Sequence, residues 1–176
     1  MFKKILVVLV VAIGAVLAYA AMQPDHFSLQ RSAPIAAPPE QLYPLIADVK
    51  AFNTWNPWLR KDSSSRVQYV GPANGVGSAY AWDSAQLGAG RMEVTDLTPA
   101  QRVAMKLQFF KPMEATNQVE FTLKPQGPQT DVTWTMSGPM PYLSKLMCVF
   151  VSMDRMVGPD FEAGLANLKA EAEKKQ

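Results

Sequence analysis

Three segments determine the fold of this chain: VAMKLQFF (residues 103–110), QVEFTL (118–123) and DVTWTMS (131–137). In each segment a large apolar residue occupies every second position, which is the period of a β-strand with one buried and one solvated face. The connections between the segments are short and contain prolines, so they predict antiparallel neighbours in a meander. The inward-facing residues are then Val103, Met105, Leu107, Phe109, Val119, Phe121, Leu123, Val132, Trp134 and Met136.

The same period continues toward the N-terminus. Alternation between Phe27 and Ile35 indicates a first strand, in which Arg31 shares the inward parity of Phe27. Pro38-Pro39-Glu40 then predicts a helix start, because proline is tolerated in a first turn and the acid suits the positive end of the helix dipole. This segment ends at Trp55-Asn56-Pro57-Trp58. We expect three further strands at Val67–Val70, Gly77–Asp83 and Arg91–Leu97.

The C-terminal segment has a helical period instead. Gly158-Pro159 interrupts it, because Pro159 cannot donate a hydrogen bond to the carbonyl of Arg155. The pattern therefore predicts either one long helix that is kinked here or a second helix that starts at Pro159. The residues on the apolar stripe are Leu143, Leu146, Met147, Phe150, Met153, Val157, Phe161, Leu165, Leu168 and Ala172.

Together these elements predict an α+β, helix-grip fold, a curved antiparallel sheet wrapped around a long C-terminal helix. Four motifs resemble the SRPBCC (START/Bet v 1-like) superfamily, and most closely its bacterial polyketide cyclase/dehydrase branch. They are the stretch from Arg31 to Glu40, Trp55-Asn56-Pro57-Trp58, Gly75-Val76-Gly77 before Tyr80-x-Trp82, and Gly158-Pro159-Asp160-Phe161-Glu162. The resemblance covers Phe27 to Lys174 and implies a deep apolar cavity for hydrophobic ligands, without implying one reaction.

The N-terminus carries an apolar run from Ile5 to Met22, preceded by Lys3 and Lys4. Eighteen helical residues span about 27 Å, close to the hydrocarbon thickness of a bilayer. The run predicts either an uncleaved signal anchor or a signal peptide cleaved after Ala20. The lysines place the N-terminus in the cytoplasm, so the rest of the chain is expected in the periplasm, held at the bacterial inner membrane if the run is retained. We therefore expect an anchor or signal peptide at residues 1–22, a linker at 23–26 and a ligand-binding domain at 27–176.

Composition narrows the possible functions. The chain has 17 basic and 15 acidic side chains, and two of the basic ones precede the apolar run, so the remainder is neutral overall. No basic cluster with interleaved aromatics is present in the sequence, which argues against nucleic acid as a partner. Cys148 is the only cysteine, so no internal disulfide forms. His26 is the only histidine, and no ligand pair has zinc-site spacing, so we expect no metal and no cofactor.

Candidate acid–base groups are scarce on the inward face. Strand parity turns Asp83, Glu93 and Glu120 toward solvent, so we expect no catalytic residue among them. Arg31 is the exception, and we expect it either in an edge salt bridge or against a ligand's head group. The ligand-binding residues that we expect are Trp55, Trp58, Tyr80, Trp82, Met105, Leu107, Phe109, Phe121, Trp134, Met136, Met147, Phe161 and Leu165.

Three functions fit the sequence. The leading hypothesis is membrane-tethered binding or transport of a hydrophobic small molecule or lipid in an internal cavity, because methionines and aromatics suit variable apolar ligands. The second is a cyclase- or dehydratase-like enzyme on an aromatic or polyketide substrate, using Tyr80, Arg31 or a bound water for proton transfer. The third is a non-catalytic envelope interaction module whose interior is filled by its own side chains. Protein partners are not indicated.

Overall fold

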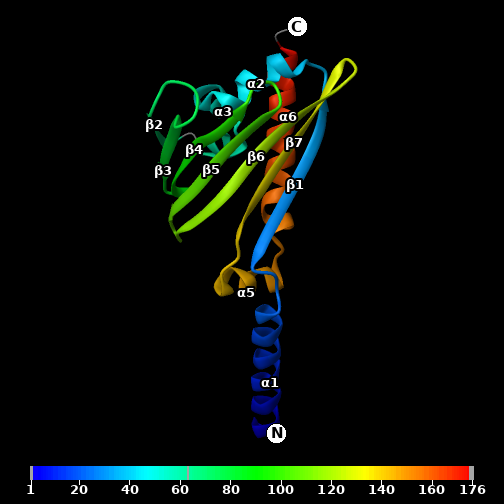
Figure 1. Ribbon diagram of the computed structural model, residues 1–176. Coiled ribbons are helices and arrows are strands. Elements are labelled where there is room, and N and C mark those ends of the chain that lie inside the picture. The colour runs from blue at the N-terminus through cyan, green and yellow to red at the C-terminus, as the bar shows by residue number, and fades with distance from the viewer. Residues whose placement is uncertain (1, 63, 175–176) are drawn as a thin grey trace.

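The computed structural model describes residues 2–62 and 64–174, and shows a long N-terminal helix that projects from an α+β domain (Figure 1). This helix, α1, spans Phe2–Ala21 and is exposed along nearly its whole length. It is long and apolar enough to cross a membrane, as an anchor or a signal sequence would be. Four residues separate it from the first strand of the domain.

The domain is built on one seven-stranded antiparallel sheet with the order β1-β7-β6-β5-β4-β3-β2. Each strand from β2 to β6 pairs with the next one along the chain, and β1 pairs with β7, so the meander predicted from the short turns is confirmed. The strands are β1 (His26–Ile35), β2 (Arg66–Val70), β3 (Ala79–Ser84), β4 (Gly88–Thr98), β5 (Arg102–Lys111), β6 (Ala115–Gln126) and β7 (Gln129–Pro139).

The predicted parity of the central strands is also confirmed. Val103, Met105 and Leu107 of β5 are buried, as are the alternate apolar residues of β6 and β7. On the opposite face, Glu120 accepts a hydrogen bond from Arg102 of the neighbouring strand. The sheet therefore has one apolar face, which is where a core or a binding site has to form.

Three short helices follow β1 and pack against the buried face: α2 (Pro39–Ala47), α3 (Val49–Trp55) and α4 (Pro57–Lys61). The Asp48 carboxylate caps α3 by accepting from the backbone of Lys50, and the Asn56 side chain caps α4 by accepting from Trp58. Helix α3 thus ends at Trp55, within the motif where the sequence suggested that the segment ends, and a separate short helix, α4, begins at Pro57.

The C-terminal part forms two helices, α5 (Tyr142–Phe150) and α6 (Met153–Glu173). The predicted break at Gly158-Pro159 is wrong as a helix start, because α6 runs through both residues. The chain breaks at Val151 and Ser152 instead, where the Ser152 hydroxyl accepts from the Arg155 amide and caps α6. Pro159 lies two turns into α6, where it removes one backbone hydrogen bond without ending the helix.

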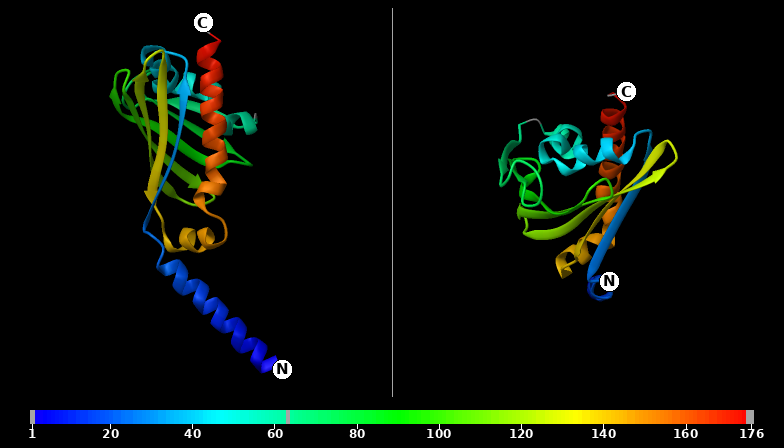
Figure 2. Two further views of the ribbon diagram at one scale, coloured as in Figure 1. Left: turned by 90° about the vertical axis from the view of Figure 1, so that its right-hand side faces the viewer. Right: turned by 45° about the horizontal axis from the view of Figure 1, so that its top comes forward.

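Helix α6 lies against the buried face of the sheet, alongside β1 (Figure 2). Its buried positions recur at helical spacing, from Phe161 through Leu165 and Leu168 to Ala172. A Cβ added at Gly164 would come 2.6 Å from the Trp134 ring, so the missing side chain lets α6 approach β7 closely. This arrangement confirms the helix-grip fold expected from the sequence.

Candidate functional site: an aromatic cluster between the sheet and α6

Six aromatic side chains meet between the sheet and α6, and we call them the aromatic cluster. Phe121 of β6 and Trp134 of β7 are register partners, with ring centroids 4.9 Å apart. The Trp134 ring stacks on Phe161 of α6, with centroids 4.1 Å apart and an interplanar angle of 14°. The remaining members come from α3 and α4 and contact these rings edge-on. The aromatic cluster consists of Phe52, Trp55, Trp58, Phe121, Trp134 and Phe161.

The two fully buried tryptophans of the cluster differ in their hydrogen bonding. The Trp55 indole N–H donates to the backbone carbonyl of Leu45 at 2.8 Å. The Trp134 indole nitrogen is equally buried but has no hydrogen-bond partner among the described residues. Buried N–H groups are nearly always paired in native proteins, so the Trp134 donor marks a position where a further acceptor would be stabilised.

A buried polar pair lies next to the cluster. The Asn56 side-chain nitrogen donates to the Tyr80 hydroxyl at 3.0 Å, and this hydroxyl also lies 3.8 Å from the Met92 sulfur. Burial raises the pKa of Tyr80 far above its usual range, although the Asn56 hydrogen bond opposes the shift. The phenol is therefore protonated at physiological pH and can donate a hydrogen bond, but it is a poor general base.

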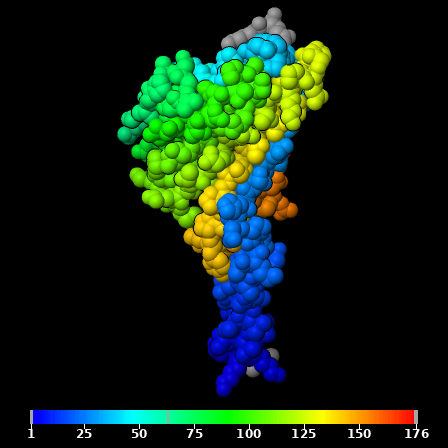
Figure 3. Space-filling view, viewed as in Figure 1, coloured from blue at the N-terminus to red at the C-terminus, as the bar shows by residue number. Residues whose placement is uncertain are grey.

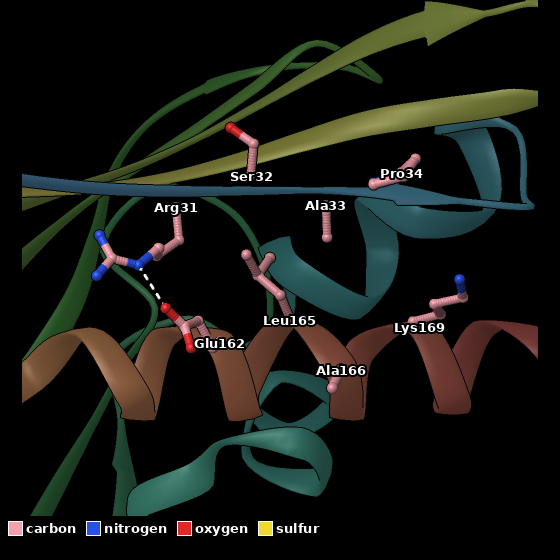
Figure 4. Close-up of a pocket in the computed structure, with 8 residues that line it drawn as sticks. All are labelled: Arg31, Ser32, Ala33, Pro34, Glu162, Leu165, Ala166 and Lys169. Atoms are coloured by element: carbon pink, nitrogen blue, oxygen red, sulfur yellow. Dashed lines mark hydrogen bonds and ion pairs between the residues drawn. The ribbon is translucent and has the colours of Figure 1, made fainter.

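Arg31 forms the edge salt bridges that were one of its two expected roles. Its guanidinium contacts Asp154 at 2.7 Å and Glu162 at 2.8 Å, both on α6. These contacts tie the edge strand β1 to α6 and line a surface groove of about 300 Å³ (Figure 4). The groove floor is apolar, with Ala33 and Leu165 facing it. Arg31 is thus the register partner of Trp134 on β7, but its guanidinium is engaged by the two carboxylates of α6.

The structure brings most of the predicted ligand-binding residues together. Trp58, Trp82 and Phe109 are partly buried and pack against the core from its margin. Met147 lies elsewhere: it is 51% exposed on α5, because the break before α6 separates the two halves of the predicted apolar stripe. Within one continuous core are Trp55, Tyr80, Met105, Leu107, Phe121, Trp134, Met136, Phe161 and Leu165.

These side chains pack together as one buried core between the sheet and α6. Two hollows among the described residues open on the surface, the groove beside Arg31 and another of about 540 Å³ beside Arg102. A ligand at the aromatic cluster would therefore need side chains to move.

Two residues of the site were not predicted. Phe52 is fully buried and meets Trp55 with centroids 4.6 Å apart. Their spacing of three residues on one helix was the available signal. Asn56 holds Tyr80 and also caps α4, and an Asn immediately before a Pro is a recognisable helix start. His26 lies exposed at the start of β1, and Cys148 is half-buried on α5.

Comparison with known proteins identifies the family of the chain. No curated protein matches the chain in sequence. Among solved structures, TTHA0849 from Thermus thermophilus is similar with a TM-score of 0.61 at 17% identity, over 85% of this chain and 99% of that one. MLL2253 from Mesorhizobium loti is similar with a TM-score of 0.61 at 16% identity, over 85% and 99%. Ara h 8.0201 is similar with a TM-score of 0.57 at 8% identity, also over 85% and 99%.

At these identities the solved structures establish the fold alone, and the family comes from the sequence. The model of the family described as "Polyketide cyclase / dehydrase and lipid transport" matches residues 26–173, which is nearly the whole domain. The chain therefore belongs to the polyketide cyclase/dehydrase and lipid transport family, within the SRPBCC superfamily.

Proposed function

We propose that this protein is a membrane-anchored carrier that binds a hydrophobic molecule with a hydrogen-bond acceptor in its aromatic cluster. The observation that carries the proposal is the Trp134 indole N–H, which is buried among aromatic rings without a partner among the described residues. An apolar ligand whose carbonyl, ester or hydroxyl oxygen met this donor would gain both ring contacts and a hydrogen bond in a dry environment.

Trp58 is the side chain that can open a path to this donor. It is the partly exposed member of the aromatic cluster and packs edge-on against both Trp134 and Phe161, with centroids 5.7 Å and 6.1 Å away. It sits on α4, a helix of five residues, and so short a helix has little stability of its own. Rotation of Trp58 would uncover the part of the Trp134 ring that it contacts, while Phe161 stays stacked on the face of that ring, and Met105 and Met136 supply adaptable walls.

The anchor is part of the proposal. Ala20, the residue before the candidate cleavage point, is fully buried in the folded structure, and the Tyr142 hydroxyl donates to the carbonyl of Leu17. These contacts give α1 a place in the folded protein, which supports retention over cleavage. With the N-terminus cytoplasmic, the four residues after α1 hold the domain within about 14 Å of the outer face of the membrane.

Mass spectrometry of organic extracts tests the binding function. Full-length wild type, Trp134→Phe and Trp55→Phe are purified from the native host's membranes and extracted in parallel. Trp134→Phe keeps an aromatic ring on Phe161 but removes the donor, so we expect about fivefold less of the enriched species, the equivalent of one hydrogen bond of about 1 kcal/mol. Trp55→Phe is the matched control, because it removes a similar ring area from the cluster but a donor that already has a partner, so a loss of ligand equal to that of Trp134→Phe would count against a role for the Trp134 donor.

A second candidate function has its own observation. The residues of the predicted binding site pack against one another as a buried core, as expected of an envelope interaction module that binds no small molecule. An extract without any enriched species, from wild type and both variants alike, would favour this candidate and count against the carrier. An intact mass equal to that of the full chain would support the retained anchor, whereas loss of residues 1–20 would refute it.

A further inference from the structure

We propose that α5 lies in the surface of the lipid bilayer that α1 spans, with its exposed apolar face inserted at the level of the head groups. The inference rests on the membrane anchor of the proposed function, but not on the identity of any ligand. It assigns a second contact with the membrane to a part of the folded domain.

The exposed face of α5 is apolar at helical spacing. Leu143, Met147, Phe150 and the following Val151 are 54%, 51%, 71% and 45% exposed, at positions i, i+4, i+7 and i+8. The single charged residue of α5, Lys145, is buried instead. Isolated exposed apolar residues are ordinary, but a contiguous apolar face without charge is typical of a surface that meets a protein or a membrane.

The contacts of α5 indicate that its apolar face meets a membrane rather than a protein. Its Tyr142 hydroxyl donates to the Leu17 carbonyl of α1 at 3.0 Å, and the Lys145 ammonium pairs with Asp25 at 2.5 Å, just after α1. The Asp25 carbonyl also accepts from the Met140 amide at 2.7 Å. These bonds hold α5 beside the C-terminal end of α1, at the foot of the domain (Figures 1 and 2). The space-filling view shows the two segments in contact (Figure 3).

The depth of this contact matches that of an interfacial helix. Leu17 lies four residues before the end of α1, which corresponds to about 6 Å along the helix axis. Interfacial helices bury their apolar face about 5–10 Å into the boundary between head groups and acyl chains. Tyr19 and Tyr142 lie near the same level, where tyrosine is enriched in membrane proteins. If α1 spans the bilayer, α5 is therefore placed in its surface.

The chemistry of the face also specifies the kind of membrane contact. Since α5 exposes no cation, its insertion depends on apolar area rather than on anionic lipid. We expect the contact in neutral phosphatidylcholine bilayers, and we expect it to be unaffected by high salt.

Depth-dependent fluorescence quenching tests the inference on the full chain. In a Cys148→Ser background, single cysteines are introduced by Val10→Cys, Phe150→Cys and Gln126→Cys and labelled with an environment-sensitive dye. Val10 lies within α1, Phe150 on the apolar face of α5, and Gln126 is exposed at the end of β6. Each protein is reconstituted into phosphatidylcholine vesicles and quenched either by nitroxide lipids or by aqueous iodide.

We expect the probes at Val10 and Phe150 to be quenched by the nitroxide lipids and protected from iodide, and the probe at Gln126 to behave in the opposite way. Iodide quenching at Phe150 equal to that at Gln126, with Val10 still protected, would overturn the inference and leave the anchor intact. Iodide quenching at Val10 would overturn the anchor and the inference together. Neither result depends on ligand binding, which the mass spectra measure separately.

Discussion

The aromatic cluster differs from the foot of the domain, where α5 meets the end of α1, in the kind of chemical group that each leaves unsatisfied. The cluster buries all of its apolar rings except that of Trp58, which is partly exposed, but leaves one polar group, the Trp134 indole N–H, without a partner among the described residues. The foot pairs its polar groups, Lys145 with Asp25 and Tyr142 with Leu17, but leaves large apolar side chains exposed.

This difference indicates which kind of neighbour would stabilise each region further. Burial of apolar area stabilises the cluster without any partner, and only a hydrogen-bond acceptor would improve it. The foot already has its hydrogen bonds, and only an apolar surrounding would improve it. The protein's interior therefore suggests a ligand, and its foot suggests a lipid surface.

The largest expected effect is a difference in the free energy of unfolding between variants of two phenylalanines, Phe161 in the aromatic cluster and Phe150 at the foot. Phe161→Ala should lower the free energy of unfolding by about 3–5 kcal/mol, because it leaves a cavity against Trp134. Phe150→Ala should change it by less than about 0.5 kcal/mol, because this side chain is 71% exposed. Urea unfolding of both full-length variants in the same mild detergent measures the difference. Equal losses would mean that Phe150 is packed in the fold, and the contrast between the two regions would fail.

A smaller difference in stability is expected between variants of the two fully buried tryptophans of the cluster. Trp55→Phe leaves the Leu45 carbonyl without its indole donor, whereas Trp134→Phe removes a donor that has no partner among the described residues. Both lose similar ring area, so we expect Trp55→Phe to be the more destabilising by about 1–3 kcal/mol. The same urea experiment measures both. A greater loss for Trp134→Phe would show that its N–H is satisfied in the folded protein.

The smallest expected effect is the loss of one ion pair at the foot when acid is added. The Lys145 hydrogen bond, helped by its positive charge, lowers the pKa of Asp25. Because this pKa is depressed on folding, the stabilisation is complete above the ordinary aspartate pKa of about 3.9 and is lost as the pH falls below it. Hydrogen-exchange protection of α5 should therefore decrease below about pH 4, before that of β7.

Asp25→Asn is the control for this prediction, because it removes the charge at every pH. Its α5 protection should be low already at neutral pH and should not fall further when acid is added. Acid-dependent loss of protection that is the same in Asp25→Asn and wild type would assign the effect to another group.

The sheet could be predicted because each of its strands carries its own signal. Alternation such as Val119, Phe121 and Leu123 specifies which face is buried, and short turns specify the antiparallel order. The buried half of the candidate site followed directly from this parity, since Phe121 and Trp134 lie on the predicted inner face.

The helices were predicted less well for a physical reason. The stripe from Leu143 to Ala172 continues in phase through Val151 and Ser152, so periodicity could not reveal that α5 and α6 are separate. A break was predicted at Gly158-Pro159 because of the proline, although one missing hydrogen bond is tolerated in a helix that packs on a sheet. Met147 was consequently assigned to the interior, whereas the structure exposes it on α5.

Features with a local cause could be read from the amino-acid sequence: the apolar length of α1, the inward parity of the strands and the apolar character of the interior. Which polar groups find partners depends on the folded chain, because pairs such as Arg31 with Glu162 and Lys145 with Asp25 are more than 100 residues apart. The Trp134 donor, which has no partner among the described residues, and the exposed apolar face of α5 are likewise features that only the folded chain determines. Hydrogen bonds and exposure depend on which neighbours the fold supplies, and a local pattern does not carry that information.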